Sequence, residues 1–408
     1  MRSQRLDRVF LAIVVALVIS GAIYGQDATP TPPAQPIPEL SPAEPTPTLT
    51  PTPAPTATPT PVPTSTAPVI NESDEIVKVD SRLVVVPVSV TDSLGGPVIG
   101  LTSKDFRIAE ENRAQVIDSV HDADKVPLEI VLLFDVSAST DAMFTFQQET
   151  AAKFLQEVMR PEDRAAVFTI GANPVLVQTR DSAEQTVISI RAIRPTKSFT
   201  AFYDSIGSAA EYLRKNAPIG TRRVIVVISD GEDTNSARIA KAIQDGYERV
   251  GEKLNTLDTK SLYALTVANR DAASLQERVR ILKMLQDGDT VFYSINPAGS
   301  SYKLNKMSMF GQENMQRFAD DTGGTAFLPK FRPIDTKDEL ANSSNIRKNS
   351  ATLEGIFNRL ANELRAQYLV QYYSDADFPN NKYVKLDVGL QNQAGRRIRA
   401  RQGYYVKN

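Results

Sequence analysis

Acidic and hydroxyl side chains recur at three places where the sequence predicts loops. Asp135, Ser137 and Ser139 alternate in one short loop that directly follows an uninterrupted apolar run, Thr200 precedes a predicted helix, and Asp230 closely follows a second apolar run. Carboxylate and hydroxyl oxygens are hard ligands suited to Mg²⁺ or Mn²⁺. The five residues therefore predict a divalent-cation site, in which protein ligands alone would leave a position open to water or to an incoming carboxylate.

The composition excludes several other kinds of site. The chain has no cysteine and a single histidine, His121, which excludes disulfides, thiolate zinc sites, cysteine nucleophiles and histidine-rich zinc sites. A Ser-His-Asp triad would have to use His121. Lys and Arg total 46 against 48 Asp and Glu, a net charge of -2, so the charge balance does not point to nucleic acid. We expect any metal to have oxygen ligands, with Mg²⁺ first and Mn²⁺ or Ca²⁺ as alternatives.

The two apolar runs are the elements that must position these residues. Residues 130–134 and 224–228 are uninterrupted apolar segments, typical of strands buried on both faces of a parallel sheet. Because ligands bind beyond the carboxyl ends of such strands, Asp135 and Asp230 are expected at one edge of the sheet. Further strands are predicted at 165–170, 291–295 and 325–328, and helices at 145–159, 202–213 and 314–319. Residues 127–365 thus predict a doubly wound α/β sheet, with a helical insertion at about 237–287.

Both flanks of this region predict β-structure. Residues 83–91 alternate valines with period two, and Pro87 within the run indicates an edge strand. Short, turn-bounded segments follow, but they are too few to close a sandwich by themselves. The C-terminal segments 367–373, 383–390 and 397–406 supply further strands. We therefore predict one small β-sandwich formed by residues 75–126 and 366–408, with the α/β domain inserted between them.

The N-terminus predicts export. Basic residues precede an apolar run at 9–24, so residues 1–25 are interpreted as a secretory signal peptide, with an uncleaved membrane anchor as the alternative. Residues 26–74 are rich in Pro and Thr and predict a disordered, extended linker. The protein is therefore expected to be secreted, periplasmic or on the cell surface.

Three motifs carry a resemblance to a known family. Asp-x-Ser-x-Ser at 135–139, Thr200 in Phe-Thr-Ala-Phe-Tyr-Asp, and Ile-Ser-Asp-Gly-Glu-Asp at 228–233 resemble the metal-ion-dependent adhesion site of von Willebrand factor A domains. The resemblance implies Ser137, Ser139 and Thr200 as direct ligands, and Asp135 and Asp230 as ligands directly or through water. It also implies adhesion or assembly rather than catalysis, with a protein partner that presents an Asp or Glu carboxylate.

A wider pattern resembles the secreted proteins related to this family that are described chiefly from acidobacteria. It covers about 75–408 and includes Asp-Thr-Gly-Gly-Thr-Ala-Phe at 321–327 and Arg-Ala-Arg-Gln-Gly-Tyr-Tyr at 399–405. The helical insertion departs from this pattern, which leaves the rim of the site and the choice of partner open.

Other interpretations of these residues remain. Asp and Ser are also common in turns and at helix N-caps, and Glu232 and Asp233 are interpreted as surface turn residues. Three functions stay open: an extracytoplasmic binding module with a divalent cation, a metal-dependent hydrolase or phosphatase of α/β fold, and a structural protein with a degenerate metal site. An aspartyl nucleophile usually has a second acid two residues on, and that position here is Ser137, so a non-enzymatic role is expected.

Overall fold

The computed structural model describes residues 82–122, 125–137, 141–196, 198–296, 306–332 and 337–407. The predicted signal peptide or anchor (1–25) and the Pro/Thr-rich linker (26–74) lie outside the described residues, as does Ser139. Within the described residues, no helix combines the length and the apolar character needed to cross a membrane.

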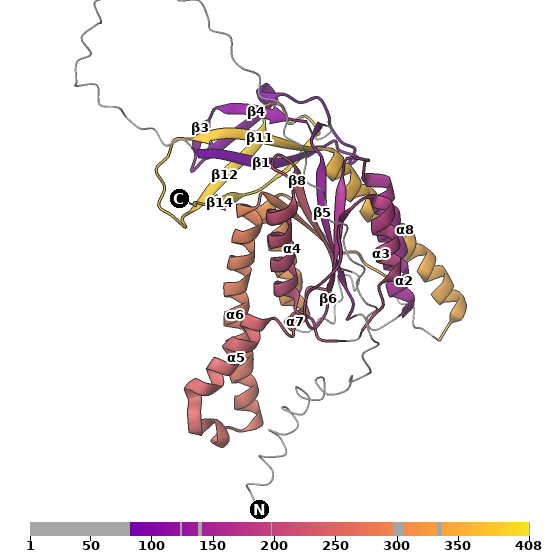
Figure 1. Ribbon diagram of the computed structural model, residues 1–408, viewed down its shortest axis with the longest axis vertical. Coiled ribbons are helices and arrows are strands. Elements are labelled where there is room, and N and C mark those ends of the chain that lie inside the picture. The colour runs from indigo at the N-terminus through magenta and orange to yellow at the C-terminus, as the bar shows by residue number, and fades with distance from the viewer. Residues whose placement is uncertain are drawn as a thin grey trace, which may run out of the picture. The chain divides into compact units, whose positions relative to one another are not determined.

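A six-stranded sheet forms the centre of the α/β domain (Figure 1). Its strand order is β10-β9-β8-β5-β6-β7. The strands are β5 (Leu128–Asp135), β6 (Arg164–Ile170), β7 (Val175–Asp181), β8 (Arg222–Ile228), β9 (Thr290–Ile295) and β10 (Ala326–Phe327). All neighbours pair in parallel except β7, an edge strand antiparallel to β6. The predicted doubly wound, mostly parallel sheet is confirmed.

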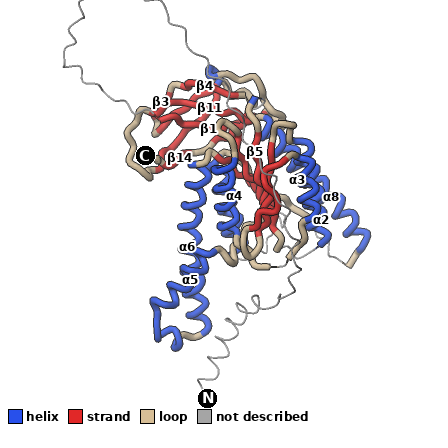
Figure 2. Tube along the Cα trace, in the orientation of Figure 1, coloured by secondary structure: helices blue, strands red, loops and turns tan. Residues whose placement is uncertain are grey.

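Helices cover both faces of this sheet (Figure 2). One layer consists of α2 (Asp141–Val158), α3 (Ala183–Ala192) and α8 (Glu339–Arg365), and the other contains α4 (Phe202–Asn216) and α7 (Lys306–Thr322). Alternate residues of β5 pack into opposite layers: Leu132 and Phe134 face the α2 side, whereas Val131 and Leu133 face the α4 side. An uninterrupted apolar run is the sequence signature of such a strand, because both of its faces are buried.

The predicted helical insertion consists of α5 (Ala237–Val250), a 3-10 helix η3 (Gly251–Thr256) and α6 (Thr259–Asp287). All buried residues of α6 lie between Ala273 and Gln286, in its second half, which packs on α4 and β9. The first half pairs with α5 instead, and together they project beyond the end of α4 (Figure 2). The insertion is therefore a helical hairpin anchored by one end.

Strands from both ends of the described chain form two small antiparallel sheets. The first has the order β13-β1-β11-β4, and the second β14-β12-β2-β3. From the N-terminal side come β1 (Arg82–Thr91), a 3-10 turn η1 (Ser103–Asp105), β2 (Phe106–Glu110), β3 (Arg113–Gln115) and β4 (Ile117–His121). From the C-terminal side come β11 (Gln367–Ser374), β12 (Tyr383–Leu390), β13 (Arg397–Ala400) and β14 (Gly403–Tyr405). Residues of both sheets share one apolar core, as expected of a β-sandwich.

The prediction that Pro87 marks an edge strand is wrong. β1 pairs with β11 from Arg82 to Ser89 and with β13 on its other side. The pairing with β13 begins only at Val88, so Pro87 lies just beyond it, opposite Leu369 of β11. A proline lacks the backbone donor that a ladder needs, and a position with a neighbour on one side only tolerates that loss.

Candidate metal centre

Asp135 is the last residue of the buried strand β5, and its side chain is held by two serines. The Ser137 amide and hydroxyl donate to Asp135 Oδ1, at 2.9 and 2.6 Å. The Ser229 hydroxyl donates to Asp135 Oδ2 at 2.6 Å. Asp135 is only 7% exposed, and burial raises the pKa of this carboxyl although the serine hydrogen bonds oppose the shift. Both carboxylate oxygens of Asp135 are therefore held in a fixed orientation by hydrogen bonds.

Asp230 lies two residues after the end of β8, in the loop that leads to α5. The Glu232 amide donates to Asp230 Oδ1 at 3.0 Å, an Asx-type turn within this loop. Burial raises the pKa of Asp230 to about 6, and the negative charges of Asp135 and Glu232 act in the same direction. Asp135 and Asp230 therefore lie close enough to repel each other, as expected for the carboxyl ends of neighbouring parallel strands.

Thr200 is a buried residue in the loop before α4, and its backbone is bonded to the Asp230 loop. Its amide donates to Thr234 Oγ1 at 2.8 Å, and its carbonyl accepts from the amides of Thr234 and Asn235 at 2.8 and 3.0 Å. On its other side, Ala201 N donates to the carbonyl of Gly171, beyond β6, at 2.7 Å. The loops after β6 and β8 thus fix Thr200 at the carboxyl edge of the sheet.

The interpretation of Asp233 as a surface turn residue is wrong. Asp233 is 8% exposed and accepts from the amides of Tyr203 and Ser236, at 3.2 and 3.1 Å, and from the Ser236 hydroxyl. Three donors occupy its two oxygens, so its carboxylate belongs to the framework of the site. Glu232 is partly buried, and its carboxylate accepts from Ser308 Oγ.

The chemistry of this cluster fits a divalent cation. Burial and the negative charge of Glu232 disfavour the charged forms of both Asp135 and Asp230, and a cation would reverse both effects. Among the described residues, no Lys or Arg forms an ion pair with either of them. No group of three or more Asp, Glu or His side chains in the described part of the chain could hold a metal by itself, so a cation here would also need hydroxyl ligands.

The structure brings together four of the five predicted site residues. Asp135, at the end of β5, and Ser137, Thr200 and Asp230, in loops, all lie at the carboxyl edge of the six-stranded sheet. The fifth, Ser139, lies outside the described residues, so its role as a ligand stays a prediction.

Sequence analysis missed Ser229, which is fully buried and holds Asp135. The only signal for it was a hydroxyl residue at the end of a strand, directly before Asp230.

Comparison with known proteins assigns the domain that carries these loops. Residues 130–232 match the family model described as von Willebrand factor type A domain. This segment contains most of β5, all of β6 and β8, and every described residue of the predicted site. The α/β domain is therefore similar to von Willebrand factor type A domains. No curated protein matches the chain.

Several solved structures resemble the chain at low identity. One is an aerotolerance-related membrane protein from Bacteroides fragilis, at 12% identity and a TM-score of 0.30, covering 55% of this chain and 99% of that one. Another is proximal thread matrix protein 1 from the mussel byssus with a zinc-occupied metal-ion-dependent adhesion site, at 12% identity and a TM-score of 0.37, covering 62% of this chain and 50% of that one. A third is a mutant of the PilB minor pilin from Streptococcus sanguinis, at 11% identity and a TM-score of 0.36, covering 57% of this chain and 63% of that one.

Proposed function

We propose that the α/β domain is a binding module that uses a divalent cation to capture a carboxylate of a partner protein. Asp135, Ser137, Ser139, Thr200 and Asp230 would hold the cation, with Mg²⁺ expected first. A bound cation would supply an open coordination position for an anionic ligand. The hydroxyl ligands carry no charge, so they would leave the ion more attractive to that ligand than an all-carboxylate site would.

The paired carboxylates of Asp135 and Asp230 carry this proposal. Asp135 is buried and Asp230 is partly buried, and burial raises the pKa of both carboxyls. The negative charge of Glu232 raises both pKa values further, and the charge of Asp135 also raises that of Asp230. The serine hydroxyls and backbone amides already orient the carboxylate oxygens before any ligand binds. Such preorganisation favours metal binding, because little ordering remains to be done when the ion enters.

The predicted export signal and linker support a location outside the cytoplasm. If residues 1–25 direct secretion, or anchor the chain through 9–24, the Pro/Thr-rich segment 26–74 would separate the folded part from the membrane or wall. Cell fractionation of the full chain tests this proposal. Recovery in the cytoplasmic fraction alone would contradict it.

Metal binding is tested by calorimetric titration of Mg²⁺ and Mn²⁺ into the full chain. Wild type is expected to bind one ion, and Asp135→Asn should abolish or strongly weaken binding because one of the two charges is lost. Asp118→Asn is the matched control, since Asp118 is an exposed carboxylate on β4 of the sandwich. Equal heats from wild type and Asp135→Asn would reject the site.

The same variants distinguish binding from catalysis. Hydrolysis of generic phosphoesters by wild type that is lost in Asp135→Asn would replace the binding proposal by a metal-dependent hydrolase. Retention of a partner from the native envelope in Mg²⁺, lost both in EDTA and in Asp135→Asn, would agree with carboxylate capture.

A further inference from the structure

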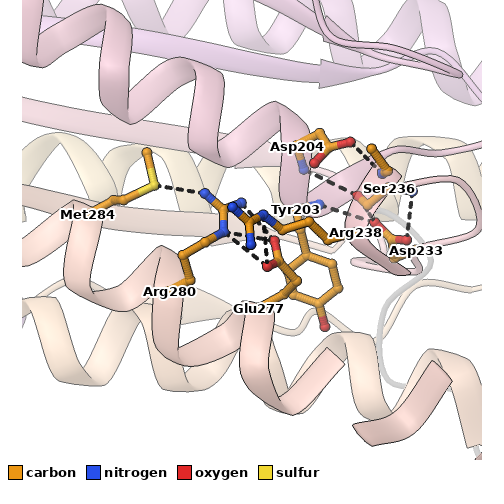
Figure 3. Close-up of polar contacts among 9 residues, drawn as sticks. Tyr203, Asp204, Asp233, Ser236, Arg238, Glu277, Arg280 and Met284 are labelled. Atoms are coloured by element: carbon orange, nitrogen blue, oxygen red, sulfur yellow. Dashed lines mark hydrogen bonds and ion pairs between the residues drawn. The ribbon is translucent and has the colours of Figure 1, made fainter. Parts of the chain in front are cut away.

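The loops that carry Thr200 and Asp230 are joined by a set of hydrogen bonds that involves two further carboxylates (Figure 3). α4 begins just after Thr200, and α5 begins just after the Asp230 loop. The N-cap residue of α4 is Ala201, which has no side-chain acceptor, and the N-cap of α5 is Ser236, which accepts no bond from its own helix. The first amides of both helices therefore need acceptors from elsewhere.

The Asp230 loop supplies an acceptor for the start of α4, and α4 supplies one for the start of α5. Asp233, from the Asp230 loop, accepts from the Tyr203 amide of α4 at 3.2 Å. Asp204, from α4, accepts from the Ala237 amide of α5 at 2.7 Å, and its own amide donates to Ser236 Oγ at 3.2 Å. A carboxylate at a helix N-terminus is also stabilised by the helix dipole. The two helices are thus capped reciprocally.

The helical hairpin of the insertion is tied to the same place. Arg238, in the first turn of α5, lies 3.6 Å from the buried carboxylate of Glu277 on α6. Arg280 binds Glu277 with both Nε and Nη2, at 2.7 to 3.0 Å (Figure 3). The start of α5 is therefore held from one side by α6 and from the other by α4.

We propose that Asp233 and Asp204 are positioning residues of the candidate metal centre, which set the placement of Thr200 relative to Asp230. The proposal rests on the proposed function of this site. Asp233 acts as a cap, because its carboxylate accepts from the Tyr203 amide of α4 and from the amide and hydroxyl of Ser236. Its contribution is geometric: removal of either cap frees the start of one helix, and with it the loop that carries a ligand. The insertion is then a structural support of the metal site as well as a projection beside it.

The test is Mn²⁺ affinity by calorimetry on the full chain with three variants. Asp233→Asn and Asp204→Ala are each expected to weaken Mn²⁺ binding about 10-fold, as loss of groups that orient metal ligands does elsewhere. Asp233 accepts with both of its oxygens, so the NH2 group of an Asn there would face a donor. Asp204→Asn should restore most of the affinity, because its amide oxygen can still accept from Ala237. Asp258→Ala is the matched control: Asp258 also caps a helix, accepting from Ser261 N at 2.8 Å, but at the start of α6.

Amide hydrogen exchange gives a readout that needs no metal. The amides of Thr234 and Asn235 donate to the Thr200 carbonyl, so their exchange is expected to speed up in Asp233→Asn and Asp204→Ala but not in Asp258→Ala. If wild type binds no Mn²⁺ while these amides respond as expected, the proposed function fails and the coupling of the loops stands. Unchanged exchange together with unchanged Mn²⁺ affinity in both variants would overturn the positioning role.

Discussion

Ser229 shows how much of the candidate metal centre depends on residues that are not ligands. Its buried hydroxyl donates to Asp135 Oδ2 and accepts from the Gly231 amide at 3.1 Å. It therefore links the end of β5 to the loop that contains Asp230. A single hydroxyl orients one carboxylate and shapes the turn that carries the other.

Ser229→Ala is expected to weaken Mn²⁺ binding about 10-fold, because Asp135 loses the bond that fixes Oδ2. Calorimetry on the full chain measures the effect. Ser182→Ala, which removes the N-cap hydroxyl of α3, should leave Mn²⁺ affinity unchanged. An affinity equal to wild type in Ser229→Ala would show that Ser229 has no part in holding the site.

The buried carboxyl of Glu363, in α8, is expected to make the stability of the protein depend on pH. This effect is independent of the candidate metal centre. Burial raises the pKa of this carboxyl, although Thr325 Oγ1 donates to it at 2.6 Å. A carboxyl with a raised pKa in the folded state holds its proton more tightly there than in the unfolded chain. The folded state therefore loses stability as pH rises from the ordinary carboxyl range through the raised value.

Glu363→Gln should remove this loss, since a Gln amide oxygen can still accept from Thr325. The expected result is a higher Tm than wild type at pH 8, with a difference that shrinks toward pH 4. Thermal unfolding followed by circular dichroism at both pH values checks it. A difference of the same size at both values would contradict the assignment.

At the scale of elements, a contact between two glycines decides how closely α7 approaches the candidate metal centre. Gly231 follows Asp230 with φ +80, in the left-handed region that favours glycine. A Cβ on Gly311 of α7 would lie 2.5 Å from the carbonyl carbon and oxygen of Gly231. Backbone atoms cannot move aside as the end of a flexible side chain can, so the close packing of helix and loop requires both glycines.

Gly311→Ala is therefore expected to destabilise the protein by about 1–3 kcal/mol, as overpacking does, and to weaken Mn²⁺ binding by displacing the Asp230 loop. Denaturant unfolding and calorimetry measure the two effects. Gly355→Ala is the matched control, because Gly355 is also helical, in α8, but has open space around its Cβ position. Gly355→Ala should raise the free energy of unfolding by about 0.5–1 kcal/mol, because alanine favours a helix more than glycine does. Equal behaviour of the two variants would exclude the contact as the cause.

At the scale of the whole molecule, the β-sandwich depends on segments far apart in the chain. β1 lies between β11 and β13, and four of its valines are fully or almost fully buried in the shared core: Val84, Val86, Val88 and Val90. The α/β domain lies between these segments in sequence, and Arg222 at the start of β8 donates to the Leu364 carbonyl just before β11 at 2.6 Å. Neither flank can form the sandwich without the other.

This dependence makes an asymmetric prediction for truncated chains. Removal of residues 366–408 alone should give an aggregating protein, because β1 would expose its valines and two backbone edges. Removal of both flanks, to leave residues 125–365, should restore solubility and retain Mn²⁺ binding, since the six-stranded sheet and its two helix layers remain. Size-exclusion chromatography and calorimetry compare the two. A soluble, metal-binding chain after removal of 366–408 alone would contradict the prediction.

Local patterns in the sequence determined the central sheet and the candidate ligands. The runs at 130–134 and 224–228 predicted parallel strands because burial on both faces leaves no polar position, and Asp135 and Asp230 then had to lie at one edge. Valine alternation in β1 predicted a half-buried strand in the same way. Such signals depend on spacing within one segment, which the sequence shows directly.

Only the tertiary structure decided which residues hold that site together. Asp233 had the sequence context of a surface turn, and its burial follows from α4, whose N-terminus lacks an acceptor of its own. The antiparallel edge strand β7 and the helices α3 and α8 were likewise not predicted, and β7 has mostly exposed side chains. α8 was missed although Leu353, Phe357 and Leu360 recur at helical spacing. For Asp233, β7 and the glycine contact the physical reason is different: a cap, an edge or a close contact is defined by a partner from elsewhere in the chain, and that partner leaves no pattern in the local sequence.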